Sequence, residues 1–282
     1  MSHDFSSVEC YMPAYASFIA EMGVDIDDFI TLGVMRRARE LNAQLGRRLF
    51  NDNDEPLFFT GDLDASFVLV HLNPKQPDRP ADFRTTPSFS TLEEYFERCR
   101  WFGASRYGPA ADGSYKSQFD RKQIRFLRPF GVIDFVDERF GNAADRRANL
   151  ERVVDRKLQL ELIPYGSDAF SAADFVDRPD VLKRHMQRIT EVIAASPRQF
   201  VIFCGAVFEP LLDAYVVQEH KFKLLRADGA PTRAAYRFAN LLIPNGNRPI
   251  TAGLAHSWAA RGLPMDAYAA EVHRRYSTAD RP

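Results

Sequence analysis

A run of apolar residues that stops at a proline constrains the fold more than any other feature of this chain. Residues 66–74 read Ser-Phe-Val-Leu-Val-His-Leu-Asn-Pro. Nearly continuous apolar and β-branched side chains are typical of a central strand that is covered on both faces. Pro74 cannot donate a hydrogen bond to a sheet, so we expect the strand to end there with Asn73 at its carboxyl end. Ligands bind at this end of the strands in open α/β sheets, although Asn-Pro is also an ordinary turn sequence.

Three later apolar runs predict further strands of the same sheet. They lie at residues 158–163, 200–204 and 249–255, with weaker β-like patterns at 221–225 and 236–243. The intervening patterns predict helices at residues 13–49, 91–101, 179–195, 206–216 and 264–276. Strands that alternate with helices favour an α/β protein, with three layers (α/β/α) and a mainly parallel central sheet. We expect one domain over residues 1–282, with loops at 75–90 and 103–117 inside a helical insertion over residues 75–156.

The composition is that of an ordinary globular protein. The chain has 282 residues, of which 45% are hydrophobic and 27% charged, and its formal net charge is −1. This charge gives no argument for nucleic-acid binding, which would need a local basic patch. No apolar stretch approaches the length of a membrane span, and the first residues lack the pattern of a signal peptide. The three cysteines are widely spaced, so we expect a cytoplasmic protein with free thiols, no metal site and no membrane association.

Four polar segments follow the predicted parallel strands. They are Asn73-Pro74, residues 164–167, Cys204-Gly205 and His256-Ser257. Because the carboxyl ends of parallel strands lie at the same edge of a sheet, we expect these segments to line one pocket.

The type and the order of these segments resemble the motifs of the uracil-DNA glycosylase superfamily. In that family a first strand ends in Asp-Pro or Asn-Pro, which Asn73-Pro74 resembles. Phe203-Cys204-Gly205 is similar to the family's Trp-Gly strand end, with Cys in place of Trp. His256-Ser257 keeps the family's His and Ser but lacks the proline between them. The likeness covers residues 66–262 as short motifs.

The resemblance implies a DNA glycosylase that hydrolyses the N-glycosidic bond of a flipped, damaged base without a metal or another cofactor. Asn73 would position the attacking water, and His256 would donate to the oxygen of the departing base. Aromatic stacking on the base would come from Phe83 or Phe89. The resemblance implies that Tyr165, Ser167 and Gly205 contact the base and that Ser257 contacts DNA. Lys75, Trp258 and Arg261 depart from the family pattern, and we expect them to contact DNA as well. Lys75 departs most clearly from the family pattern, because a long cation at the pocket floor would crowd a base.

Each of these residues also has a structural interpretation. His256 is one of six histidines, and a lone histidine is often a structural hydrogen bonder. Tyr165 is typical of a packed aromatic, and Ser167 of a turn. Fold alone does not carry function. Two hypotheses therefore stay open: a base-flipping glycosylase that acts on single-stranded or duplex DNA, and a non-catalytic relative that binds a nucleobase, a nucleotide or a protein.

Overall fold

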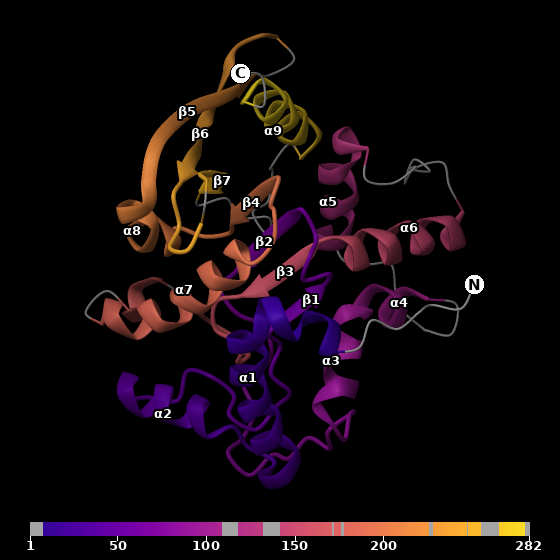
Figure 1. The fold of residues 1–282 in the computed structure, drawn as a ribbon, viewed down its shortest axis with the longest axis vertical. Coiled ribbons are helices and arrows are strands. Elements are labelled where there is room, and N and C mark those ends of the chain that lie inside the picture. Colours follow the sequence, from indigo (N-terminus) through magenta and orange to yellow (C-terminus); the bar gives the residue numbers. More distant parts are fainter. Residues whose placement is uncertain are drawn as a thin grey trace.

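A mixed β-sheet forms the centre of the molecule. The computed structural model describes residues 8–108, 118–131, 142–170, 172–175, 178–225, 228–246, 248–254 and 265–279. Within these residues a seven-stranded sheet has the order β1-β3-β2-β4-β7-β6-β5 (Figure 1). The strands are β1 Phe59–Gly61, β2 Phe67–His71, β3 Leu158–Glu161, β4 Phe200–Phe203, β5 Val216–Leu225, β6 Pro231–Leu241 and β7 Ile250–Leu254.

The central part of the sheet is parallel. Strand β2 pairs in parallel with β3 on one side and with β4 on the other, and β4 pairs in parallel with β7. Val70 is thereby opposite both Leu160 and Phe203. The prediction that the apolar runs share one sheet and run parallel is confirmed, although the sheet as a whole is mixed. The edges are antiparallel, since β1 pairs with β3 and the long β5–β6 hairpin adds to β7.

Helices cover both faces of the sheet. They are α1 Val8–Leu32, α2 Arg36–Leu45, α3 Leu92–Arg100, α4 Phe102–Tyr107, α5 Gln118–Leu127, α6 Ala143–Arg156, α7 Pro179–Ala194, α8 Phe208–Leu212 and α9 Met265–Ala279, with short 3-10 turns at Arg128–Phe130, Ala172–Phe175 and Asp213–Tyr215. Helices α1, α3, α7 and α8 share one hydrophobic core with the sheet, and α4, α5, α6 and α9 share the other (Figure 1). None of the described helices is long and apolar enough to cross a bilayer.

Local chemistry explains where helix α3 begins. The Thr91 hydroxyl accepts a hydrogen bond from the Glu94 backbone N–H at 3.2 Å, and the Glu94 carboxylate accepts from the Ser90 N–H at 2.7 Å. The Thr91 hydroxyl thereby satisfies a backbone donor that the first helical turn leaves free, and Glu94 holds the residue before the N-cap.

Two predictions about the connections need correction. Residues 103–117 were expected to form a loop, but Phe102–Tyr107 is helix α4, and residues 109–117 lie outside the described part. The helix expected at 206–216 is short, because α8 spans only Phe208–Leu212 before a 3-10 turn and the start of β5. The described part of the expected insertion contains α3 to α6, which connect the neighbouring parallel strands β2 and β3.

Candidate functional site

The order of the parallel strands creates a switch point between β2 and β4. The chain leaves β2 toward β3 on one side, whereas it leaves β4 toward β5, which lies on the other side beyond β7 and β6. In open α/β sheets the crevice at such a point, beyond the carboxyl ends of the strands, is where ligands bind. Asn73 follows β2 and Gly205 follows β4 at this place. We therefore take this edge as the candidate site.

Three hydrogen bonds fix the Asn73 side chain. Its Nδ2 donates to Ser167 Oγ at 2.8 Å, and to the backbone oxygens of Tyr165 and Pro74 at 3.2 Å each. Because backbone oxygens only accept, these contacts determine which end of the amide is nitrogen. No described residue donates to the opposite atom, Oδ1, and the side chain is half-buried. Asn73 thus presents a fixed acceptor at the switch point.

The chain segments after β2 and β3 run side by side and make this arrangement rigid. The Ser167 N–H donates to the Pro74 oxygen at 3.1 Å, and the Gln76 N–H donates to the Ser167 oxygen at 3.0 Å. Gly166 allows the close approach, since a Cβ there would lie only 1.8 Å from Gln76 Oε1. Ser167, predicted as a site residue, is buried. Together with the backbone oxygens of Pro74 and Tyr165 it holds the Asn73 side chain, an arrangement that we call the Asn73 clamp.

Gly205 brings the end of β4 close to Asn73. Its φ of +136° is one that L side chains rarely adopt, so glycine is required by the backbone itself. A Cβ at this position would lie 3.4 Å from the methyl groups of Leu72, the residue before Asn73. The structure therefore brings Asn73 and Ser167 into contact and places Gly205 beside Leu72, the residue before Asn73.

Two predicted aromatic residues lie elsewhere. The Tyr165 side chain is 2% exposed, and its hydroxyl donates to Asp25 Oδ2 at 2.8 Å. Phe89 is buried against Phe29 and Tyr95, with ring centroids 6.2 and 4.9 Å away. Both rings contribute to the hydrophobic core, so neither is placed to contact a base at the switch point. Only the backbone oxygen of Tyr165 reaches Asn73.

The Asp25–Tyr165 pair is itself perturbed by burial. Desolvation raises the pKa of Asp25 to about 6, although the Tyr165 hydroxyl and the Arg37 guanidinium act in the opposite direction. Desolvation and the Asp25 charge also raise the pKa of Tyr165, which stays protonated. The tyrosine is therefore a donor that anchors α1 to the β3 strand end.

Loop 75–90 carries the other predicted contacts. Asn53 Nδ2 holds the loop by donating to the backbone oxygens of Pro80 and Phe83, at 2.8 and 2.9 Å. The Phe83 ring is half-buried, and the Arg79 guanidinium lies 4.5 Å from its centroid. The Lys75 side chain is 83% exposed, with Nζ 3.7 Å from Asp168 Oδ1. Lys75 thus extends into solvent, and the expectation that it crowds a pocket floor does not fit the structure.

The remaining predicted residues are His256, Ser257, Trp258 and Arg261, and they lie outside the described residues. His256 follows the end of β7 by two positions in the sequence, and β7 is the parallel neighbour of β4.

Sequence reasoning missed a row of polar side chains that begins just before β3 and continues along it, with Lys157 and Glu161 buried and Gln159 half-buried. Lys157 Nζ donates to Gln159 Oε1 at 3.0 Å, and Gln159 Nε2 donates to Glu161 Oε1 at 2.8 Å. Desolvation raises the pKa of Glu161 to about 8. His71 is opposite Glu161 on β2, and desolvation with the nearby Lys157 charge lowers its pKa to about 3. The alternation of polar residues at 157, 159 and 161 was the available signal.

Neither the models of protein families nor the curated proteins give a match to the chain.

Proposed function

We propose that the chain hydrolyses the N-glycosidic bond of a nucleotide whose base is flipped out of DNA, with Asn73 positioning the attacking water. The observation that carries this proposal is the Asn73 clamp, which turns Oδ1 outward as a fixed acceptor at the switch point. The resemblance of four motifs to the uracil-DNA glycosylase superfamily supports the same function.

The reaction asks little covalent chemistry of the protein. Asn73 Oδ1 accepts a hydrogen bond from a water molecule whose oxygen bonds to the anomeric carbon of the sugar. The bond from that carbon to the base breaks, and its electron pair leaves with the base. An amide does not take up the proton of the water, so that proton passes to solvent while the base anion takes up one proton, and the role of Asn73 is orientation. Gly205, which has no side chain, is proposed to lie against the base, and His256 is proposed as the donor to the base.

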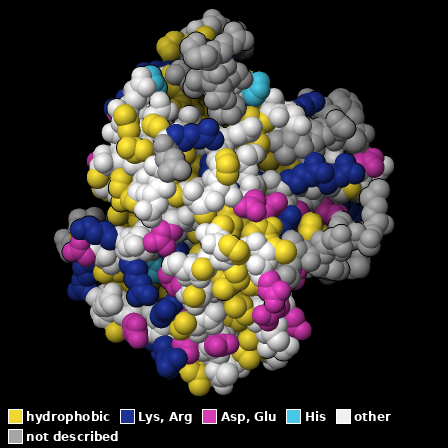
Figure 2. All heavy atoms as spheres, in the orientation of Figure 1, with side chains coloured by type: hydrophobic (Ala, Val, Ile, Leu, Met, Phe, Trp, Pro, Cys, Tyr) yellow, Lys and Arg dark blue, Asp and Glu magenta, His cyan; other side chains and the backbone are white. Residues whose placement is uncertain are grey.

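A second candidate is a non-catalytic protein of the same fold that binds a nucleobase, a nucleotide or another protein. It is favoured by the burial of Phe89 and Tyr165, two of the aromatic side chains that would hold a base. The formal net charge of −1 points the same way. On the face shown in Figure 2, Lys and Arg side chains lie among Asp and Glu side chains.

Base release from oligonucleotides separates the two candidates. Single-stranded and duplex oligonucleotides with uracil and other damaged bases would be incubated with the wild type, Asn73→Ala and Asn240→Ala. Asn240 lies on the β6 strand, away from the switch point, and serves as the matched control. We expect Asn73→Ala to slow release by about 100-fold, because misplacing a reactant by about 1 Å has such an effect.

Binding measured by fluorescence anisotropy at low salt completes the test. Asn73→Ala is expected to bind the oligonucleotides as tightly as the wild type, because Asn73 orients water and does not hold the duplex. Tight binding of nucleotides without base release by the wild type would favour the second candidate. Absence of both release and binding over the whole panel would contradict the enzymatic proposal.

A further inference from the structure

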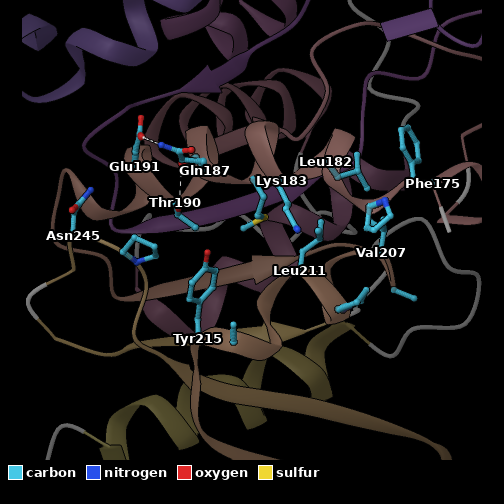
Figure 3. Close-up of a pocket in the computed structure, with 16 residues that line it drawn as sticks. Phe175, Leu182, Lys183, Gln187, Thr190, Glu191, Val207, Leu211, Tyr215 and Asn245 are labelled. Carbon is cyan, nitrogen blue, oxygen red and sulfur yellow. Dashed lines mark hydrogen bonds between the residues drawn. The ribbon is translucent and has the colours of Figure 1, made fainter. Parts of the chain in front are cut away.

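A cavity of about 720 Å³ lies between helix α7 and the segment that contains α8 (Figure 3). Its floor consists of buried apolar side chains, namely Phe175, Leu182, Met186 and Val207. Ligand pockets for small molecules typically have volumes of roughly 300–1,000 Å³ and mostly apolar linings. The cavity therefore has the size and the interior of a small-molecule site.

The two walls of the cavity come from regular structure. Leu182, Met186 and Thr190 are spaced by four residues, so they lie along one face of α7. Leu211 and Tyr215 form the opposite wall and face α7 across the cavity (Figure 3). A ligand with an elongated apolar body fits between such walls, because it would cover apolar side chains on both sides.

The rim of the cavity carries a positive charge at one end and a negative charge at the other. Lys183 lines the cavity in the second turn of α7, near the helix end at which the dipole favours anions. Glu191 lines it eight residues further on, about 12 Å along the helix axis. A negatively charged head group is thus attracted at the Lys183 end and repelled at the Glu191 end.

The present partner of Lys183 is easily replaced. Lys183 Nζ lies 2.5 Å from Asp180 Oδ1, in a pair whose side chains are 70% and 81% exposed. Exposed pairs of this kind contribute only about 0–1 kcal/mol, so exchanging Asp180 for another carboxylate costs little. Glu191 is held differently, because its Oε1 accepts from Gln187 Nε2 at 2.9 Å.

We propose that this cavity binds a small amphipathic carboxylic acid, whose carboxylate pairs with Lys183 and whose apolar chain covers Leu182, Met186 and Leu211. The proposal is independent of the proposed glycosidase function, since none of the Asn73 clamp residues lines the cavity.

Calorimetric titration with decanoate and with decanol tests the proposal on the full chain. The two probes share an apolar chain of the same length and differ in charge. We expect the wild type to bind decanoate about 3- to 5-fold more tightly than decanol, because an exposed ion pair contributes up to about 1 kcal/mol. Lys183→Gln should weaken decanoate binding by about 3- to 5-fold and leave decanol binding unchanged. Lys221→Gln is the matched control, because Lys221 is an exposed lysine on β5 outside the cavity.

A second variant tests whether the apolar chain of the ligand lies in this cavity. Ala214 is an exposed lining residue, so Ala214→Trp narrows the cavity without disturbing the core. This variant should lose binding of both probes and unfold at the temperature of the wild type. Equal affinity for the two probes, no binding of decanoate by the wild type, or full binding by Ala214→Trp would each overturn the proposal. Base release from oligonucleotides plays no part in these outcomes.

Discussion

The two faces of the central parallel strands are built differently. The face toward α1 and α7 is apolar along these strands, with Val68, Val70, Leu158, Leu160, Val201 and Phe203 all buried. The face toward α5 and α9 has apolar residues on β2 and β4 but also carries Lys157, Gln159 and Glu161 on β3 and His71 on β2. Packing determines how much the first face contributes to the stability of the fold. The contribution of the second face also depends on which of its side chains are protonated.

The polar row explains how charges are tolerated on the second face. A buried charge is costly unless it is paired and hydrogen-bonded. Gln159 accepts from Lys157 and donates to Glu161, so both ends of its amide are used. The comparison of the faces therefore predicts that changes on one face alter stability equally at every pH, and that changes on the other alter its pH dependence.

Leu160→Ala should have the largest effect, because Leu160 is fully buried on the apolar face. Removing a buried leucine side chain costs about 2–5 kcal/mol through lost burial and the cavity that remains. Urea denaturation at pH 5 and pH 8 should give the same loss of unfolding free energy. Leu225→Ala is the control, because Leu225 is 66% exposed and its loss should cost less than about 0.5 kcal/mol. A loss that differs by more than about 1 kcal/mol between the two pH values would contradict the distinction between the faces.

Glu161→Gln should change the pH dependence of stability on the polar face. The pKa of Glu161 is raised from 4.5 to about 8, so between these values the folded state keeps a proton that the unfolded state releases. The stability that this proton contributes is complete below pH 4.5, falls as pH rises, and is lost above pH 8. The wild type should therefore lose about 1.4 kcal/mol per pH unit relative to Glu161→Gln within this window.

Urea denaturation of both proteins from pH 4 to pH 9 measures this difference. Other titrating groups, such as Asp25 and Asp155, cancel because they are common to both proteins. A free-energy difference that is constant across the range would mean that Glu161 titrates at its ordinary pKa, and the contrast between the faces would then be one of polarity alone.

The two faces were not equally predictable from the sequence. Continuous apolar runs such as Val68–Val70 and residues 200–203 identify buried parallel strands, and Asn-Pro identifies where β2 ends. From these runs it follows that β2, β3, β4 and β7 run parallel in one sheet, and that the chain segments after β2 and β3 meet at Asn73 and Ser167. The polar row was not predicted, because alternating Lys, Gln and Glu normally indicates a solvated strand face, whereas residues of α5 lie beside Lys157 here.

The burial of Phe89 and Tyr165 also could not be predicted from the sequence. Phe89 and Tyr165 follow loop and strand-end signals, and both have the size and shape to stack on a base. Their burial depends on α1, which supplies Phe29 against Phe89 and Asp25 for the Tyr165 hydroxyl. A contact between residues 140 positions apart leaves no local pattern in the sequence.

Tyr165→Phe sharpens the comparison at the carboxyl end of the apolar face. The hydroxyl stabilises the ionised form of Asp25, whose pKa is raised to about 6 from 3.8, so its loss should raise that pKa further. We expect a destabilisation of about 1–2 kcal/mol at pH 8, where the unfolded carboxyl is ionised, and a smaller one at pH 4. Thermal unfolding at the two pH values measures it. A larger loss at pH 4 would mean that Asp25 is not the partner that matters.

Lys75→Ala should have the smallest effect, because it touches neither face. The Lys75 side chain is 83% exposed and its pair with Asp168 is open to solvent, so the unfolding free energy should change by less than about 0.5 kcal/mol at any pH. Any base release should also stay within about 2-fold of the wild type, because Lys75 points away from the Asn73 clamp into solvent. A 10-fold gain in base release on removal of this lysine would show instead that its side chain reaches the site during binding, and the edge of the sheet would then have to be more mobile than its clamped backbone indicates.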